Sequence, residues 1–484
     1  MLEKILSGKE INFNQLEKEI FKIGCEYAQK ITVQLLSIID DKIAKSRDRS
    51  EYRHKGKRKT TLKTLMGEVE FERVIYETQN EEGEKAYVFL LDEVMKLETF
   101  GKVSTNLAFK IAENACISSF RNSAKNVTDM TGQSISHGGV WNIVQSLGEK
   151  IKEVENEYAK IAADGQIIGQ KETKILFEEA DGVWINIQGK DRPKKGRKLE
   201  MKVAVAYDGW EKRAKNRYEL RNKIAIAGFE GSKEFQKRKE GVISSVFNTD
   251  EITIRILNGD GAGWIKTGLL DDTVHYQLDP FHLNREILRK IKNKEQKDAI
   301  IRILSEKRVE DGLIYLKAIA EMAEDEKNKE KLTELHQYLS NNKEGLIPYK
   351  ERNLKLPPAP EGVEYRQLGT MEHHICDIIA QRMKHRKASW SIKGSENLGK
   401  ILTQKVCKTL YEKITNLSTI ILPERYTQEI CQIISAAKTP TKDGKGYRYP
   451  IIGKTPFEGV FITNGRKAIQ SMIKDKNATA LIYR

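Results

Sequence analysis

Apolar residues in the first part of the chain recur at three- and four-residue steps, and the pattern then changes to a strict alternation. The steps run from Leu16 to Ile39 and predict that residues 1 to about 45 are helical. The alternation covers Thr61–Val74 and has Gly67 in its middle. It predicts a β-hairpin whose turn uses this glycine.

Helical periodicity returns further along the chain. Two apolar stripes, over 120–130 and 140–151, lie on either side of Gly132. Ser134 or Ser136 is positioned to cap the second of these helices. A helix, a glycine-containing turn and a second helix form the helix-turn-helix pattern, so the pair is a candidate for reading DNA in the major groove. A plain helical hairpin is the alternative.

Beyond residue 170 the chain contains a series of strand-like runs. They are Ile175–Gln188, Leu199–Tyr207, Asn222–Gly228, Ile252–Leu257 and Val274–Leu278. The first three follow one another, and a helix-like stretch, Gly263–Leu270, separates the last two. Three consecutive strands followed by strand, helix and strand predict an α/β fold with a mixed sheet.

The remaining chain is mainly helical, and a domain contains about 100–200 residues, so we expect several domains. Charged helical patterns extend from 283 to about 345 and, after a proline-rich break, from about 366 to 421. We expect an N-terminal helical and hairpin region (1–103), a helix-turn-helix-like DNA-binding region (104–165), an α/β domain (170–405) with a helical insertion at about 286–365, and a C-terminal helical and loop region (406–484).

Composition argues against several classes of protein. The sequence has no run of about 18 apolar residues, which argues against a membrane span, and its first residues lack the apolar core of a signal peptide. The five cysteines, at positions 25, 116, 376, 407 and 431, form no CxxC pair. This usage is typical of a reduced cytoplasmic protein.

The net charge of +15 is concentrated in three segments: 45–63 with net +7, 190–202 with net +5 and 381–393 with net +5. Clustered positive charge favours a polyphosphate partner, because each neutralised phosphate releases counterions. A solvated surface is the alternative for any single segment. The candidate DNA-binding residues are Arg53, Lys55, Lys57, Arg58, Lys59, Lys194, Lys195, Arg197, Lys198, Arg382, Lys384, Arg386 and Lys387.

Three acidic residues of the α/β region are candidates for chemistry. Asp181 lies within the first strand run among apolar residues, where an acid is costly unless something compensates it. Asp260 follows the fourth strand in a glycine-rich loop, and Glu396 opens a helix directly after the third basic segment. Open α/β sheets bind their ligands at the carboxyl ends of their strands.

Carboxylates that meet at one point can bind a pair of Mg²⁺ ions, which prefer oxygen ligands. Two such ions, about 4 Å apart, support in-line phosphoryl transfer. Each residue also has a simpler interpretation: Asp181 and Asp260 as turn residues, and Glu396 as a first-turn acid favoured by the helix dipole. Glu178 and Glu179 compete with Asp181 as the first ligand.

The segment after the fifth strand adds His282 and Arg285, which share one helix face and either support the site or only solvate the helix. Other motifs fail. The GDGAGW loop lacks the spacing of a dinucleotide- or ATP-binding loop. The potential zinc ligands match no common site; they are His373, His374, Cys376 and His385.

Together, several segments resemble the ISLre-type bacterial insertion-sequence transposases, a group similar to Mutator-like transposases. These segments are the hairpin Thr61–Arg73, TGQSIS at 131–136, EADGVWI at 179–185, NGDGAGWI at 258–265, LDPFHLNRE at 278–286 and WSIKGSENLGK at 390–400. The resemblance covers nearly the whole chain.

The resemblance implies a ribonuclease-H-like catalytic domain with a DDE triad of Asp181, Asp260 and Glu396, and Asp279 with His282 as a signature pair. It also implies two Mg²⁺ ions, with Mn²⁺ able to substitute. The implied partner is double-stranded DNA, as terminal inverted repeats and as target, bound by a homo-oligomer. The implied location is cytoplasmic, with nucleoid association when DNA is bound.

The expected function is therefore a DNA transposase that binds insertion-sequence ends and catalyses metal-dependent strand cleavage and strand transfer. In this scheme His282 contacts the scissile phosphate or orients a ligand carboxylate, and Arg285 holds a neighbouring phosphate. A structure-selective nuclease of the same fold and a non-catalytic domesticated DNA-binding protein are the alternatives. Joined DNA products would separate the first alternative, and metal dependence the second.

Overall fold

The structure is a computed structural model of the chain and describes residues 12–80, 83–95, 97, 102–194, 196–269, 271–385 and 387–417. All of these described residues belong to one compact unit. The features expected after residue 417, including most of the C-terminal region, lie outside the described residues.

The first elements are a long helix and a three-stranded antiparallel sheet. They are α2 (Phe13–Ser46), β1 (Arg53–Thr64), β2 (Gly67–Gln79) and β3 (Lys85–Val88), followed by the short α3 (Leu90–Met95). The predicted hairpin is confirmed: Thr64 pairs with Gly67, whose φ of +116° is one that a side chain would disfavour. The buried Asp40 of α2 accepts a hydrogen bond from the Val74 backbone nitrogen (3.0 Å), which attaches the helix to the sheet.

Three helices come next: α4 (Thr105–Ile117), α5 (Phe120–Met130) and α6 (His137–Ala163). The predicted helix, break and helix are present, and of the two candidate caps Ser136 accepts the hydrogen bond from the Gly139 nitrogen (3.1 Å). Beyond its first turns α6 contacts α7 and α15, which cover the central sheet. The second helix of the predicted DNA-binding pair, α6, therefore packs against helices of the α/β region.

The central sheet has the strand order β10-β9-β4-β5-β8. Its strands are β4 (Ile175–Asn186), β5 (Lys198–Tyr207), β8 (Ile224–Gly228), β9 (Ile254–Gly259) and β10 (Val274–Leu278). The consecutive strands β4, β5 and β8 are antiparallel, whereas β9 and β10 run parallel to β4. This confirms the predicted α/β fold with a mixed sheet.

Side chains alternate between the two faces of this sheet, and each face has its own core. On one face, Leu176 and Ala204 pack with Phe235 and Val242 of α7 (Ser232–Ser244). On the other face the core includes α15 (Ile392–Val406), α13 (Met371–Ile375), α16 (Leu410–Asn416) and residues of α4, α5 and α6. The π-helical turn Cys376–Ala380 and α14 (Gln381–Met383) follow α13 directly.

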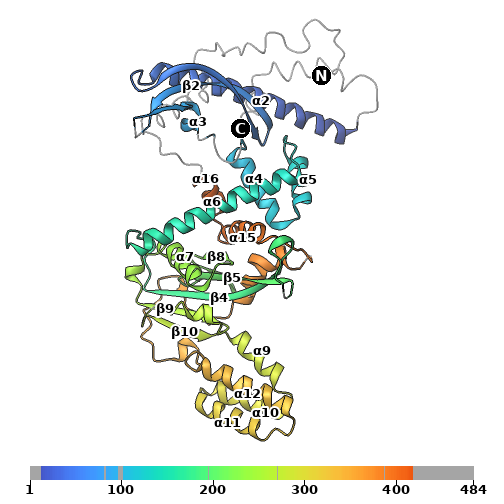
Figure 1. The fold of residues 1–484 in the computed structure, drawn as a ribbon, viewed down its shortest axis with the longest axis vertical. Coiled ribbons are helices and arrows are strands. Elements are labelled where there is room, and N and C mark those ends of the chain that lie inside the picture. The colour runs from blue at the N-terminus through green and yellow to red at the C-terminus, as the bar shows by residue number, and fades with distance from the viewer. Residues whose placement is uncertain are drawn as a thin grey trace. The chain divides into compact units, whose positions relative to one another are not determined.

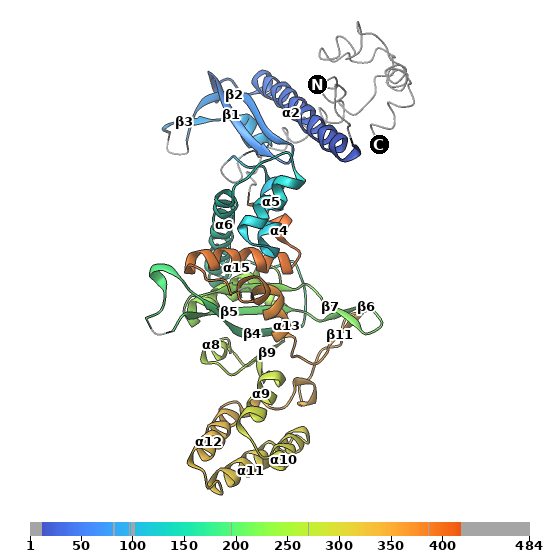
Figure 2. The ribbon, with the colours of Figure 1, turned by 90° about the vertical axis from the view of Figure 1, so that its right-hand side faces the viewer.

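Two further groups of elements flank the sheet. A small sheet with the order β11-β6-β7 is formed by β6 (Trp210–Ala214), β7 (Arg217–Leu220) and β11 (Val363–Glu364), and was not predicted (Figure 2). After α9 (Pro280–Lys290), the helices α10 (Lys294–Ser305), α11 (Val309–Glu321) and α12 (Glu326–Asn341) share a core of their own (Figure 1). This group lies where the sequence predicts the helical insertion.

Candidate active site

Three aspartates are aligned across three neighbouring parallel strands. Gly259, the last residue of β9, pairs with Ala180 of β4 on one side and with Leu278 of β10 on the other. The next residues along these strands are Asp181, Asp260 and Asp279. Adjacent strands lie about 4.8 Å apart, so the register alone brings three acids to the end of β9.

Asp181 is buried and contacts His282 of α9. The distance from its Oδ2 to His282 Nε2 is 3.2 Å, and Arg285 Nη2 lies 3.0 Å from His282 Nδ1. Because an arginine can only donate, Nδ1 accepts this hydrogen bond and the proton lies on Nε2, facing Asp181. Burial disfavours the charged imidazole, but the hydrogen bond and the charge of Asp181 prevail and raise the pKa of His282.

Asp279 holds α9 in position. Its Oδ1 accepts hydrogen bonds from the backbone nitrogens of Phe281 (2.9 Å) and His282 (3.2 Å), as an N-cap residue does. Its Oδ2 accepts a hydrogen bond from Asn258 Nδ2 (2.8 Å). Both oxygens are engaged, so Asp279 orients His282.

Asp260 is a half-buried acid at the end of β9. Its Oδ1 accepts a hydrogen bond from the Ala262 backbone nitrogen (2.8 Å), which stabilises the glycine-rich loop. Burial is the largest cause of a raised pKa of Asp260, and the negative charge of Asp181 raises it further. Two acids that repel each other in this way favour a bound cation.

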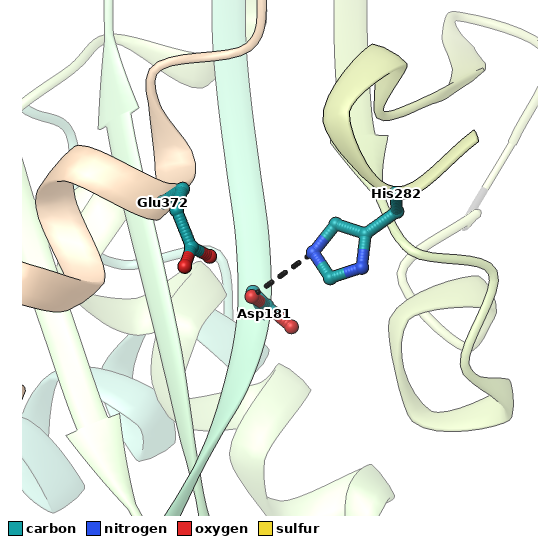
Figure 3. Close-up of side chains that lie close together, drawn as sticks. All are labelled: Asp181, His282 and Glu372. Atoms are coloured by element: carbon teal, nitrogen blue, oxygen red, sulfur yellow. Dashed lines mark hydrogen bonds and ion pairs between the residues drawn. The ribbon is translucent and has the colours of Figure 1, made fainter. Parts of the chain in front are cut away.

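Glu372 completes the cluster, although sequence reasoning did not select it. One ligand atom each from Asp181, His282 and Glu372 lies within 4.8 Å of the others. Figure 3 shows Glu372 approaching Asp181 from α13 and His282 approaching it from α9. Carboxylates and an imidazole are common ligands of divalent metals, so the group is a candidate metal centre.

Glu396 occupies a different place. Its Oε1 and Oε2 lie 2.9 and 3.0 Å from Lys152 Nζ of α6, and its charge also acts on Arg238 of α7. Glu396, which follows the first turn of α15 instead of opening the helix as predicted, is thus directed to neighbouring helices, whereas α13 provides the acid beside Asp181. Glu372 carried a sequence signal similar to that of Glu396: it opens a helix, two residues after a loop that ends in Gly369 and Thr370.

The alternatives to Asp181 are engaged elsewhere. Glu178 points to the α7 face, where it binds Lys239 and Arg255 (Nε at 2.7 Å). Glu179 points to the other face and is fully buried. Strand alternation thus separates these two residues, and Asp181 is the acid of β4 that faces both Glu372 and His282.

Glu179 attaches α13 to the sheet. Its carboxylate accepts hydrogen bonds from the backbone nitrogens of Gly369 (3.1 Å) and Thr370 (3.0 Å) at the start of α13, and from the Tyr207 hydroxyl (2.7 Å). It also accepts one from Asn258 Nδ2 (3.1 Å), the group that binds Asp279. Burial raises the pKa of Glu179. This hydrogen-bond network links the elements that carry Glu372 and His282.

The predicted DNA-binding residues differ in their surroundings. On β1, Lys55 pairs with Glu77 (2.8 Å) and Lys59 with Glu70. Arg382 is buried, donates from Nε to the Ala115 carbonyl oxygen (2.7 Å) and lies over the Trp390 ring, so it is a core residue. The exposed members are Arg53, Lys55, Lys57, Arg58, Lys59, Lys194, Arg197, Lys198, Lys384 and Lys387, whereas Lys195 and Arg386 lie outside the described residues.

The fold thus defines an α/β protein with a candidate metal centre at the carboxyl ends of its parallel strands. The chain belongs to UPF0236, an uncharacterised protein family, whose model matches residues 6–415. A UPF0236 protein of Caldanaerobacter subterraneus subsp. tengcongensis is 25% identical over 403 residues, which is 82% of this chain and 78% of the relative. The UPF0236 protein in the vanSb 3′ region of Streptococcus gallolyticus is 25% identical over 414 residues, covering 83% and 84% of the two chains.

Among solved structures, the Drosophila P element transposase strand transfer complex matches with a TM-score of 0.20 and 10% identity, covering 71% of this chain and 89% of that chain. A score this low supports no argument about the fold or function of the protein. In the part of the chain that the structure describes, no helix has the length and apolar character needed to cross a membrane.

Proposed function

We propose that the protein is a DNA transposase that cleaves and joins DNA strands at the carboxylate cluster. The observation that carries the proposal is the placement of Asp181 and Asp260 at neighbouring strand ends, with ligand atoms of Asp181, Glu372 and His282 within 4.8 Å of one another. Two aspartates from parallel neighbouring strands and a glutamate from a later helix match the DDE pattern that the sequence resemblance implies. In this assignment Glu372 takes the role first considered for Glu396.

The sheet supports the same proposal. Three antiparallel strands in sequence, followed by two strands parallel to the first, give the order β8-β5-β4-β9-β10. This arrangement, with acids at the first and fourth strands, agrees with the ribonuclease-H-like domain that the sequence resemblance implies and so supports the proposal. The helical group α10–α12 would then be an insertion between the fifth strand and the helices that follow.

The donor set fits hard divalent cations such as Mg²⁺, because Asp181, Asp260 and Glu372 all offer carboxylate oxygens. When bound, two such ions would activate the attacking oxygen and stabilise the leaving oxygen of an in-line phosphoryl transfer. His282 orients Asp181 through the hydrogen bond between them, and Asp279 fixes His282 by capping α9. The exposed Arg285 is available to hold a phosphate of the DNA next to the cluster.

Positive segments near the cluster support DNA as the substrate. Beyond Asp181, β4 continues to Asn186 and into the basic loop that leads to β5. Assembly of several copies on DNA stays a prediction from the resemblance.

The test is a cleavage assay with a supercoiled plasmid that carries the ends of the insertion sequence. We expect Mg²⁺-dependent nicks at the end boundaries and joined products with the wild-type protein, and neither with Asp260→Asn. Nicks without joined products would support the nuclease alternative. Binding to the ends without any cleavage would support the non-catalytic alternative, and cleavage by Asp260→Asn would contradict the proposed site.

A further inference from the structure

Trp184 stands apart from the other tryptophans of the chain. Its side chain is 52% exposed, whereas Trp210, Trp264 and Trp390 are buried and Trp141 is half-buried. Trp184 lies on β4 three residues after Asp181, which places the two Cα atoms about 10 Å apart along the strand. Because the interval is odd, strand alternation points the Trp184 ring to the α7 face of the sheet, opposite to the face of Asp181. A large apolar ring is thus held at the surface of the α7 face, where β4 extends beyond the end of β9.

Strand β9 pairs with the first half of β4 but not with the second half, which carries Trp184. The pairing of β4 with β9 ends at Ala180 and Gly259, but β4 continues for six more residues. The backbone is next paired at Ile187, which forms a bridge with Trp390. Trp184 therefore lies in a stretch of β4 that pairs with no strand on the β9 side within the described part of the chain.

Two of the basic segments meet at the end of this stretch of β4. The Gln188 nitrogen donates to the Trp390 carbonyl oxygen (2.8 Å), and the Trp390 nitrogen donates to the Asn186 carbonyl oxygen (2.9 Å). These bonds bring the loop between β4 and β5 next to the segment that precedes Trp390. The exposed cations there are Lys190, Arg192, Lys194, Arg197, Lys198, Lys384 and Lys387.

The cations of this loop are available to a ligand. Within the described part of the chain, Lys194, Arg197 and Lys198 form no ion pair. On β1, by contrast, Lys55 and Lys59 are paired with Glu77 and Glu70. Unpaired cations gain more from phosphate contact, because no existing salt bridge has to be broken.

The neighbours of Trp184 on the sheet leave its ring accessible. Glu200 is directly opposite on β5, and Lys198 and Lys202 are the diagonal neighbours. The Glu200 carboxylate lies over Gly182, since a β-carbon there would collide with Glu200 Oε1. Glu200 thus leans toward the carboxylate cluster, and its pKa, raised mainly by burial, is raised further by Asp260 and Asp181.

We propose that Trp184 is a stacking platform for an unpaired nucleotide of a bound DNA strand, with Lys198, on the same face of the sheet, and the adjoining basic loop holding its backbone. An exposed aromatic ring beside unpaired cations is the arrangement by which proteins bind single strands. A base inside a duplex offers no free face, so the ligand is a nucleotide that is unpaired or turned out of the helix. The inference rests on the proposed function in one respect, that DNA is the substrate.

The test is a binding measurement in EDTA by fluorescence anisotropy, with a labelled 20-nucleotide oligo(dT) and a duplex of equal length as probes. We expect Trp184→Ala to weaken binding of oligo(dT) by about 5- to 150-fold, as loss of one stacked base does, with a smaller effect on the duplex. Trp184→Phe keeps an aromatic ring and should retain most of the affinity. Tyr87→Ala, which removes an aromatic side chain that is 58% exposed on β3, should leave binding unchanged.

A second readout uses the ring itself. Oligo(dT) should quench the tryptophan fluorescence of the wild-type protein and quench it less in Trp184→Phe. Wild-type affinity for oligo(dT) in Trp184→Ala, an equal loss on both probes, or no binding of oligo(dT) by the wild type would overturn the inference. Because no metal is present and no cleavage is measured, these outcomes are independent of the plasmid assay that tests the proposed function.

Discussion

At the residue scale, the acids of the carboxylate cluster are held in position by buried groups that do not themselves belong to the cluster. Glu179 is one of them, since its carboxylate binds the start of α13 and thereby sets the place of Glu372. We expect Glu179→Gln to leave at least one buried donor unpaired and to lower the free energy of unfolding by about 1–3 kcal/mol. Urea denaturation would measure this change, and the exposed Glu172→Gln should be neutral by comparison. Equal stability of the two variants would contradict the positioning role of Glu179.

His282 makes the free energy of unfolding depend on pH. The pKa of His282 is raised in the folded protein by Asp181, against the opposing effect of burial, and the unfolded pKa is about 6.5. The stabilisation from this pair is therefore fully present below pH ~6.5 and is lost as the pH rises through the folded-state pKa. We expect the difference in unfolding free energy between the wild type and His282→Gln to narrow from pH 6 to pH 8. A difference that stays constant over this range would contradict the pairing.

The sequence alone does not show which glutamate lies beside Asp181. Asp181, Asp260 and His282 were predicted from strand position and motif, and the structure brings Asp181 and His282 into contact. Glu372 and Glu396 both lie near the start of helices that follow loops, and nothing in the local sequence shows which of them reaches Asp181. Only the tertiary path of the chain decides which helix faces the end of β9.

At the scale of elements, α6 packs closely against two helices, α7 and α15, that cover opposite faces of the sheet. A β-carbon at Gly148 would lie 2.5 Å from the Cα and the carbonyl oxygen of Asn397 in α15. We expect Gly148→Ala to destabilise the fold by about 1–3 kcal/mol, because the backbones cannot move apart without loss of packing. Thermal unfolding would measure the effect. The control is Gly24→Ala on α2, where no atom lies within 4 Å and where alanine should be neutral or slightly stabilising.

The elements themselves were largely predictable. Most of the central sheet is buried on both faces, and strands such as β8 therefore appear in the sequence as continuous apolar runs. The small sheet of β6, β7 and β11 escaped prediction because its strands are short and mostly polar, as in Glu211–Ala214. Strand β11 also lies far along the chain from β6, its partner, so no local pattern predicts this pairing.

At the scale of the whole molecule, the net charge of +15 predicts DNA binding that weakens steeply with salt. The slope of log affinity against log salt is about 0.9 per phosphate contact on duplex DNA. Replacing Lys194, Arg197 and Lys198 by glutamine should therefore reduce this slope by up to about 3. The same number of replacements at Lys55, Lys57 and Lys59, which pair with acids, should reduce it less. Equal reductions for the two triple variants would show that existing ion pairs do not decide which cations meet the DNA.

The central claim is that Glu372, together with Asp181 and Asp260, forms the catalytic cluster. The most direct test compares Glu372→Gln and Glu396→Gln in the plasmid cleavage assay with Mg²⁺, with equal folding verified by circular dichroism. We predict that Glu372→Gln abolishes nicking, whereas Glu396→Gln loses only its contact with Lys152 and continues to cleave. Cleavage by Glu372→Gln, or loss of cleavage in Glu396→Gln alone, would contradict the assignment.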